Sequence, residues 1–277
     1  MERSVIIDGA RTPFGKFGGA LRSFSAPQLG GFAIKAALER AQIDGDQVDE
    51  VIFGSVLQGG QGQIPSRQAA RYAGLPWEVA TETINKVCAS GMRSVSLADQ
   101  IIRAGDANVI VAGGMESMSN APYFLPKARW GLSMGDDQLK DLMIHDGLTC
   151  SFQSVHMGAY GNRVAKEYGI TREQQDEWAL MSHRRAIAAR GKLREEIVPI
   201  EVPQRKGDPI LVQDDEAPRE DTSIEQLKKL PSVFSEDGTI TAGNAPGVND
   251  GAAALVVTSE SYAKQAGLPA MARIIAS

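Results

Sequence analysis

A cysteine at the junction of a strand and a helix is the residue in this sequence with the clearest capacity for chemistry. Cys88 follows the strand-like segment 81–85 and opens the segment 88–104, whose apolar residues recur at helical spacing. Backbone N–H groups and the helix dipole stabilise a thiolate there, so the pattern predicts a thiol pKa below about 8.5. The small residues that follow would let a substrate approach the backbone. Cys88 is therefore a candidate nucleophile, although a single cysteine is more often buried and inert.

The helix that would carry Cys88 is amphipathic, and one of its faces is expected to lie against a sheet. Four apolar residues form the expected buried stripe: Val95, Ala98, Ile101 and Ile102. Four polar or charged residues are expected to face outward: Arg93, Asp99, Gln100 and Arg103. A helix with this pattern would place the cysteine at its first turn and use its remaining length for packing.

Strand-like and helical segments alternate around this helix. Short apolar strands are expected at residues 4–8, 51–53, 81–85 and 109–112. Helices are expected near residues 66–73 and after Ser25, where Gln28 completes a capping-box signature. The alternation is typical of an α/β fold, and it predicts a mostly parallel sheet with helices on both faces.

A charged segment between residues 120 and 248 interrupts this alternation. It contains a helical piece at 171–189, which begins with a second capping-box signature made by Thr171 and Gln174. Strand and helix patterns then return at 251–258, 259–266 and 270–275. The expected domains are 1–119 together with 249–270, the insertion 120–248, and the beginning of a further domain at 271–277.

The composition excludes several classes of function. The 277 residues have a net charge of -5 and no basic run interleaved with aromatic residues, so nucleic acid is not an expected partner. No apolar stretch approaches the roughly 20 residues of a membrane span, and the N-terminus shows no secretory pattern. Cys88 and Cys150 are the two cysteines, which is no disulfide framework. We therefore expect a cytoplasmic protein without a membrane partner.

Motifs for bound cofactors are missing from the sequence. It contains no G-x-G-x-x-G fingerprint, no Walker nucleotide loop and no H-E-x-x-H zinc motif. The three histidines and two cysteines lack the spacing of a zinc site. The sequence therefore predicts neither a metal nor an organic cofactor.

Several long motifs follow one another in the order that is typical of one enzyme family. They are ARTPFGKFGG at 10–19, QGGQGQIPSRQAA at 58–70, NKVCASGMR at 85–93, AGGMESMS at 112–119, DGLTCSFQSVHMG at 146–158 and TAGNAPGVNDGAAA at 241–254. On these motifs the chain resembles the thiolase family from its first strand to its last residue. Within that family it is most similar to the acetyl-CoA acetyltransferases. The resemblance strongly favours Cys88 as a nucleophile.

The resemblance implies a ping-pong acyl transfer between CoA thioesters. Cys88 would attack the thioester carbonyl of an acyl-CoA, release CoA and hold the acyl group. A second acetyl-CoA, deprotonated at its methyl carbon, would attack that group in a Claisen condensation that forms acetoacetyl-CoA, and the reverse reaction is thiolysis. Two alternatives stay open: a broader 3-ketoacyl-CoA thiolase of fatty-acid oxidation, and a non-catalytic protein on the same scaffold that binds acyl-CoA or lipid.

The charged insertion is the segment that would hold CoA in such a protein. Four of its residues match family positions that line the pantetheine tunnel: Leu148, His156, Met157 and Ala242. Without that context, His156 would more often be a structural histidine. Arg219 matches an arginine near the adenine nucleotide, although a single arginine in a polar loop is more often a solvated charge. Pro246 stands where the family commonly has serine, and it offers CoA neither a hydroxyl nor a backbone N–H.

The resemblance also implies the architecture. The sheet segments would form the N-terminal βαβαβ half of a thiolase fold, with a mixed sheet and covering helices, and residues 120–248 would form an α+β loop domain. The family's second half carries an Asn-Glu motif, a Gly-His-Pro motif and a second catalytic cysteine, none of which occurs in these 277 residues. Without the base that these motifs supply, the Claisen step should be lost even where Cys88 is correctly built. We therefore expect this chain alone to be inactive in the complete reaction, and the complete protein to be a homodimer or a homotetramer.

Overall fold

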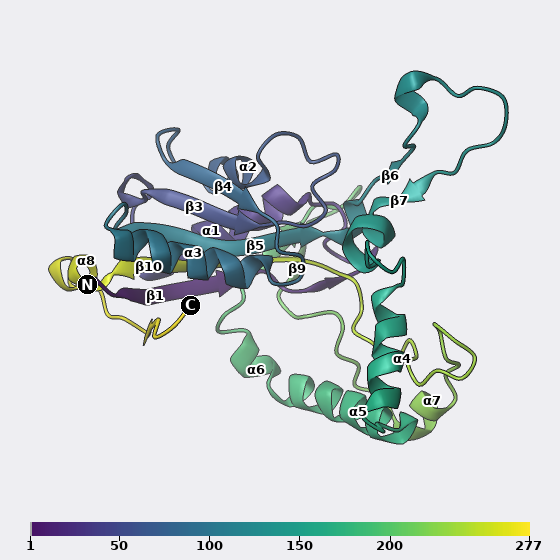
Figure 1. The fold of residues 1–277 in the computed structure, drawn as a ribbon. Helices are drawn as coiled ribbons and strands as arrows, with labels where there is room; N and C mark the ends of the chain where they lie inside the picture. The colour runs from purple at the N-terminus through teal and green to yellow at the C-terminus, as the bar shows by residue number, and fades with distance from the viewer. Residues whose placement is uncertain (1) are drawn as a thin grey trace. The chain divides into compact units, whose positions relative to one another are not determined.

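Residues 2–277 are described by a computed structural model that divides into two compact units (Figure 1). The first unit contains the residues up to Asn120 together with Arg194–Asp215 and Asn249–Ser277. The second unit contains Ala121–Leu193 and Glu216–Val248. Each unit has its own internal packing.

The first unit is built on a mixed seven-stranded sheet with the order β11-β1-β10-β5-β3-β4, in which β2 also pairs with β10. The strands are β1 (Ser4–Arg11), β2 (Gly15–Lys16), β3 (Glu50–Gly54), β4 (Ala80–Ile84), β5 (Val109–Ser117), β10 (Asn249–Ser259) and β11 (Ala272–Arg273). Strand β3 runs parallel to β4 and β5, whereas β10 runs antiparallel to β1, β2 and β5.

The expectation of a mostly parallel sheet is therefore wrong, and the mixed sheet that the thiolase resemblance implies is confirmed. The connection from β5 to β10 runs through the long insertion, so the chain can re-enter the sheet in the opposite direction. Antiparallel neighbours need no crossover helix, and an apolar strand pattern does not reveal the direction of its neighbour.

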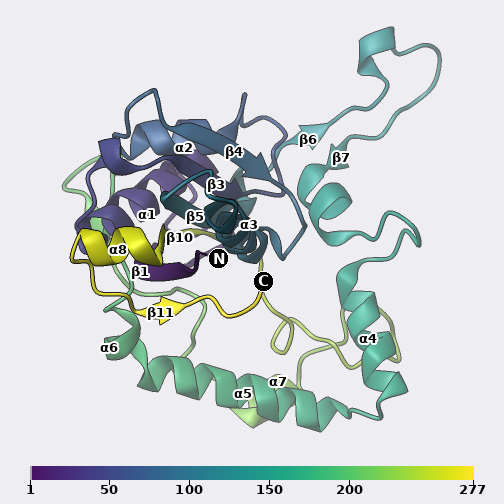
Figure 2. The same cartoon turned by 60° about the vertical axis from the view of Figure 1, so that its left-hand side comes forward.

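Helices cover both faces of this sheet, as the alternation predicts (Figure 2). The helices are α1 (Ala26–Ala41), α2 (Pro65–Tyr72), α3 (Ser90–Ala104) and α8 (Glu260–Gln265). Successive side chains of a strand point to opposite faces. Val109 and Val111 of β5 accordingly join the cluster that contains α1, while Ile110 and Ala112 join the cluster that contains α3.

The two capping-box signatures mark helix starts in the structure. Ser25 Oγ accepts the N–H of Gln28 at 3.4 Å, and Gln28 Oε1 accepts the N–H of Ser25 at 2.9 Å. Thr171 and Gln174 exchange the same pair of bonds at 3.3 and 2.9 Å. Both predictions are confirmed, because the polar groups that satisfy the first turn lie within the local sequence.

Helix α3 departs from its expected pattern at one position. Ala98 and Ile102 are buried as predicted, but Asp99 is only 2% exposed although it is expected to face outward. Its carboxylate accepts the hydroxyl of Ser277 at 3.0 Å and lies 3.5 Å from Nη1 of Arg103. An apolar stripe predicts the packed side of a helix, but it cannot show that a distant segment supplies a polar partner.

The segment Arg194–Asp215 packs within the first unit, although its charge places it in the expected insertion 120–248. It forms a hairpin of β8 (Ile200–Val202) and β9 (Ile210–Val212). Nε of Arg11 lies 2.6 Å from Glu196, and its terminal nitrogens lie 2.7 and 2.9 Å from the Asp215 carboxylate. Charge density alone does not distinguish such partly buried ion pairs from a solvated face. Strand β11, in the expected further domain 271–277, likewise pairs with β1 of this unit.

The second unit is mainly helical. Its helices are α4 (Met157–Glu167), α5 (Arg172–Ala188), α6 (Arg190–Leu193) and α7 (Ile224–Lys228), with a π-helical turn at Met143–Leu148 and a hairpin of β6 (Tyr123–Phe124) and β7 (Lys140–Asp141). The fully buried Asp176 accepts bonds from Arg172 at 2.8 Å and Asn244 at 2.9 Å, which ties α5 to the segment around residue 244. Within residues 2–277, no helix has both the length and the hydropathy of a membrane span.

Candidate active site

Cys88 lies in a tight turn between β4 and α3, and its residue is exposed. Val87, directly before it, has a φ of +51°, a conformation that a β-branched residue rarely adopts. The side chain of Asn85 stabilises this turn, because its Oδ1 accepts the N–H of Val87 at 2.9 Å. A strained residue held by a specific hydrogen bond beside an exposed thiol is typical of functional sites.

Ser90 closes the turn from the other side. The residue is 4% exposed, and its hydroxyl donates to the carbonyl of Val87 at 2.6 Å and accepts the N–H of Lys86 at 2.8 Å. The N–H of Ala89 donates to the carbonyl of Lys86 at 3.2 Å. The backbone on both sides of the thiol is therefore fixed by hydrogen bonds.

The helix begins later than the sequence pattern predicts. Its first residue is Ser90 and its N-cap is Ala89, so Cys88 lies two residues before the helix rather than in its first turn. The amides of Ala89 and Ser90 already donate to carbonyls of the turn, so these two are not free to meet the thiolate. The thiol is still at the N-terminal end of α3, where the positive end of the helix dipole lies.

Two glycines let this helix end approach the sheet. A Cβ at Gly54, the last residue of β3, would lie 2.5 Å from Cβ of Ser90 and 2.6 Å from its carbonyl carbon. A Cβ at Gly114 of β5 would lie 3.3 Å from Cα of Gly91. The turn that carries Cys88 therefore rests directly on the backbone of two parallel strands.

Glu116 of β5 is an acidic residue at the same end of the sheet. Its carboxylate accepts the N–H groups of Val56 and Leu57 at 2.8 and 3.2 Å and a hydrogen bond from the side chain of Ser55. Burial raises the pKa of Glu116, and these hydrogen bonds partly offset that effect. Asn85 then reaches the same loop, because its Nδ2 donates to the carbonyl of Val56 at 3.4 Å.

In the second unit, His156 caps helix α4. Its Nδ1 accepts the N–H of Gly158 at 3.0 Å, and its ring stacks on that of Phe234 with centroids 4.7 Å apart and planes at 18°. A Cβ added at Gly158 would overlap the Phe234 ring, so a larger residue would fit there only if the ring moved. No sequence pattern identifies Phe234 as the partner of His156, because it is a single aromatic residue in a polar segment.

Three other residues expected to contact pantetheine lie in or beside segments of the second unit that contact His156 or helix α4: Leu148, Met157 and Ala242. Leu148 ends the π-helical turn, one residue before Thr149, which forms a β-bridge with His156. Met157 is the first residue of α4 and is 42% exposed. Ala242 and Pro246 are exposed. Asn162 of α4 accepts the N–H groups of Thr239 and Ile240 at 3.0 Å each, which brings the segment before Ala242 to this helix.

Arg219 lies beside the histidine of α5. Its backbone N–H donates to Nδ1 of His183 at 3.2 Å, and its side chain is exposed. Burial and the Arg219 charge lower the pKa of His183, so the neutral ring is the form that accepts this bond. The sequence motifs do not identify His183 as a site residue.

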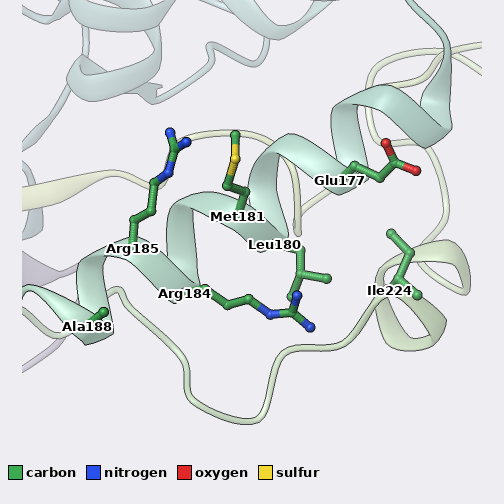
Figure 3. Close-up of a pocket in the computed structure, with 7 residues that line it drawn as sticks. All are labelled: Glu177, Leu180, Met181, Arg184, Arg185, Ala188 and Ile224. Carbon is green, nitrogen blue, oxygen red and sulfur yellow. The ribbon is translucent and has the colours of Figure 1, made fainter.

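An open groove of about 570 Å³ lies along α5 (Figure 3). Leu180, Met181 and Ala188 of α5 and Ile224 of α7 give it apolar walls, and Glu177, Arg184 and Arg185 carry charges at its rim. None of the residues predicted to contact CoA lines this groove. Its lining residues Met181, Arg184 and Arg185 stand on both sides of His183 in the sequence of α5.

Comparison with known proteins agrees with this fold and these motifs. The thiolase N-terminal domain matches residues 4–261. An acetyl-CoA acetyltransferase of Pseudomonas aeruginosa is 51% identical over 276 residues, which is 99% of this chain and 70% of that protein. Proteins of the same name from Cupriavidus necator and Escherichia coli are each 53% identical, over 98% and 99% of this chain and 69% and 70% of their own lengths. The chain belongs to the thiolase family.

Proposed function

We propose that this chain carries the nucleophile of an acetyl-CoA C-acetyltransferase, with Cys88 as the acyl acceptor. The observation that supports this most directly is an exposed thiol directly before the N-terminal end of α3. It lies in a turn that hydrogen bonds of Asn85 and Ser90 hold in place. It occurs in a member of the thiolase family whose relatives are named acetyl-CoA acetyltransferases at about 50% identity.

The first half-reaction is acyl transfer to sulfur. The Cys88 thiolate attacks the carbonyl carbon of acetyl-CoA, a new C–S bond forms, and the bond to the CoA sulfur breaks so that CoA leaves as a thiolate and takes up a proton. In the second half-reaction a base removes a methyl proton from another acetyl-CoA. The resulting carbanion attacks the carbonyl carbon of the acetyl group on Cys88 and forms a C–C bond. The C–S bond to Cys88 breaks, which releases acetoacetyl-CoA and restores the Cys88 thiolate. The thioesters are the substrates, and this chemistry uses no metal or organic cofactor.

The CoA moiety is proposed to bind to the second unit. Leu148, His156, Met157 and Ala242 would contact pantetheine, Arg219 would meet the nucleotide, and Pro246 would contribute only apolar contact. Support comes from the contacts that link α4 to the segments 232–240 and hold His156 in place. The half-buried His183 beside Arg219 adds a polar group to the expected nucleotide site.

Intact-mass measurement after incubation with acetyl-CoA tests the proposal. We expect one added acetyl group on the unsubstituted chain and on Cys150→Ala, none on Cys88→Ala, and reversal of the adduct when free CoA is added. Cys150→Ala is the matched control because it removes the other free thiol. An adduct that persists in Cys88→Ala would contradict the assignment. Tight CoA binding without any adduct would instead indicate a non-catalytic acyl-CoA-binding protein.

Cytoplasmic location and self-association complete the proposal. Both cysteines are free, which suits a reducing compartment. Several large apolar side chains of the second unit are strongly exposed, among them Trp130 at 89% and Met134 at 103%, and such surfaces often mark interfaces between subunits. Light scattering is expected to show a dimer or a tetramer for the protein at its relatives' full length, and a monomer at all concentrations would contradict this.

A further inference from the structure

A continuous series of hydrogen bonds runs from Glu116 on β5 to the turn that carries Cys88. The carboxylate accepts the N–H of Val56 at 2.8 Å, the carbonyl of Val56 accepts Nδ2 of Asn85 at 3.4 Å, and Oδ1 of Asn85 accepts the N–H of Val87 at 2.9 Å. The first two bonds join segments that are distant in sequence and the third lies within the turn, so the series connects β5, the loop after β3 and the turn after β4.

The ends of this series differ in their surroundings. Glu116 is partly buried within a strand that pairs on both sides, whereas Asn85, Val87 and Cys88 are exposed. Val87 also has a positive φ of 51°, which its own side chain does not favour. Such a conformation persists only where its surroundings hold it. The loop 55–57, held by Glu116, is the surrounding structure that reaches this turn through Asn85.

We propose that Glu116 is a positioning residue for Cys88, acting through the loop 55–57 and Asn85 to hold the turn in its reactive geometry. The proposal rests on the proposed role of Cys88 as the acyl acceptor. Glu116 suits this task because each of its two carboxylate oxygens accepts one backbone N–H, whereas a glutamine in the same position would turn its NH2 group toward one of these donors.

Glu116→Gln is the principal test. We expect faster hydrogen exchange of the amides at residues 86–88, and a rate of Cys88 acetylation by acetyl-CoA that falls on the order of 10- to 100-fold because a misplaced nucleophile loses its alignment. The matched control is Asp49→Asn. Asp49 also accepts two backbone N–H groups, from Asn108 and Val109 at 2.7 and 2.9 Å, but precedes β3 at its opposite end. That variant should leave both readouts at Cys88 unchanged.

A second variant tests whether Asn85 transmits the effect of Glu116 to the turn that carries Cys88. Asn85→Ser keeps an oxygen that can accept the N–H of Val87 but is too short to reach Val56, and position 85 is exposed, so folding should be retained. We expect a loss of the same order, and the double variant with Glu116→Gln should be no slower than the slower single variant. Independent effects would multiply instead.

The outcomes separate the two proposals. Unchanged exchange at 86–88 in Glu116→Gln, or multiplicative losses in the double variant, would overturn the positioning role while leaving Cys88 as acceptor. If acetyl-CoA fails to modify the unsubstituted chain, the proposed function fails. The exchange measurement, together with the iodoacetamide reactivity of Cys88 relative to Cys150 in the same molecule, still decides the positioning role.

Discussion

The ring of His156 stacks on the ring of Phe234, with centroids 4.7 Å apart, while the same ring accepts the N–H of Gly158 at the start of α4. One side chain therefore caps a helix and joins it to a segment almost 80 residues away. A residue expected to touch CoA thus also has a structural task in the second unit. The two tasks can be separated by substitution.

His156→Asn is expected to keep most of the helix cap, because asparagine is a favourable N-cap residue, and to lose the stacking contact, at a cost of about 0.5–1.5 kcal/mol in the free energy of unfolding. His156→Ala should lose both and cost about 1 kcal/mol more. Denaturant unfolding measures these values. Equal stability of the two variants would show that the cap contributes nothing.

Phe234→Leu provides the control for the stacking contribution, since it leaves the cap in place. If His156 also contacts pantetheine, His156→Asn should weaken CoA binding in titration calorimetry more than Phe234→Leu does. Equal weakening in both variants would assign the effect to the packing of α4 alone.

Tyr160→Phe is expected to raise the pKa of Cys150. The Tyr160 hydroxyl donates a hydrogen bond to this thiolate, with further backbone hydrogen bonds from Gln153 and Phe152, and together they lower the pKa of Cys150 from its usual value. The pH at which alkylation is half-maximal should therefore move upward, measured in a Cys88→Ala background so that one thiol reacts. An unchanged midpoint would show that Tyr160 does not stabilise the thiolate.

Arg219→Gln should raise the pKa of His183 toward its ordinary value. Burial lowers this pKa first and the Arg219 charge lowers it further, so only part of the shift should disappear. The unfolded chain binds the proton more readily than the folded one below pH ~6.5. The stability contribution of neutral His183 is thus fully present above that pH and is lost as pH falls toward the folded pKa.

NMR titration of the His183 ring in both proteins provides the values, and the pH dependence of the unfolding midpoint should become shallower in Arg219→Gln. A His183 pKa that is identical in the two proteins would mean that the Arg219 side chain turns away from the ring in solution.

Local features of the sequence predict local features of the structure well. The capping boxes at Ser25 and Thr171 fix the starts of α1 and α5 because both partners lie within four residues. Strand β5, by contrast, extends to Ser117 rather than ending at Ala112, because Gly113 and Gly114 continue pairing with β10 where a glycine pair suggests a turn.

Partners that are distant in sequence explain what the patterns missed at the site. Cys88 is identified by its position between a strand and a helix, and that position is confirmed to within two residues. Asn85 and Glu116 lie inside the quoted motifs, but their tasks depend on Val56, which sits 29 and 60 residues away. The direction of β10, the burial of Asp99 and the pairing of Arg11 with Asp215 depend on such long-range contacts too.

Gly54→Ala should disturb the candidate active site with little change to the sheet itself. The added Cβ would lie 2.5 Å from Cβ of Ser90, 2.6 Å from its carbonyl carbon and 2.8 Å from the nitrogen of Gly91, and two of these three atoms are backbone. The start of α3 must therefore move outward, which displaces the turn that Ser90 closes. We expect slower acetylation of Cys88 by on the order of 100-fold and a loss of about 1–3 kcal/mol in stability.

Gly74→Ala is the control for Gly54→Ala. It distinguishes general backbone strain from the steric overlap that Gly54→Ala creates beside Cys88. Gly74 has a φ of +89°, and a Cβ added there would meet no atom within 4 Å, so its substitution strains the backbone away from Cys88 without filling space. It should lower stability without slowing acetylation at a temperature where both variants stay folded. If Gly54→Ala reacts as fast as the unsubstituted chain, the close contact between β3 and α3 does not set the geometry of Cys88. The sheet would then serve only as a support for the fold.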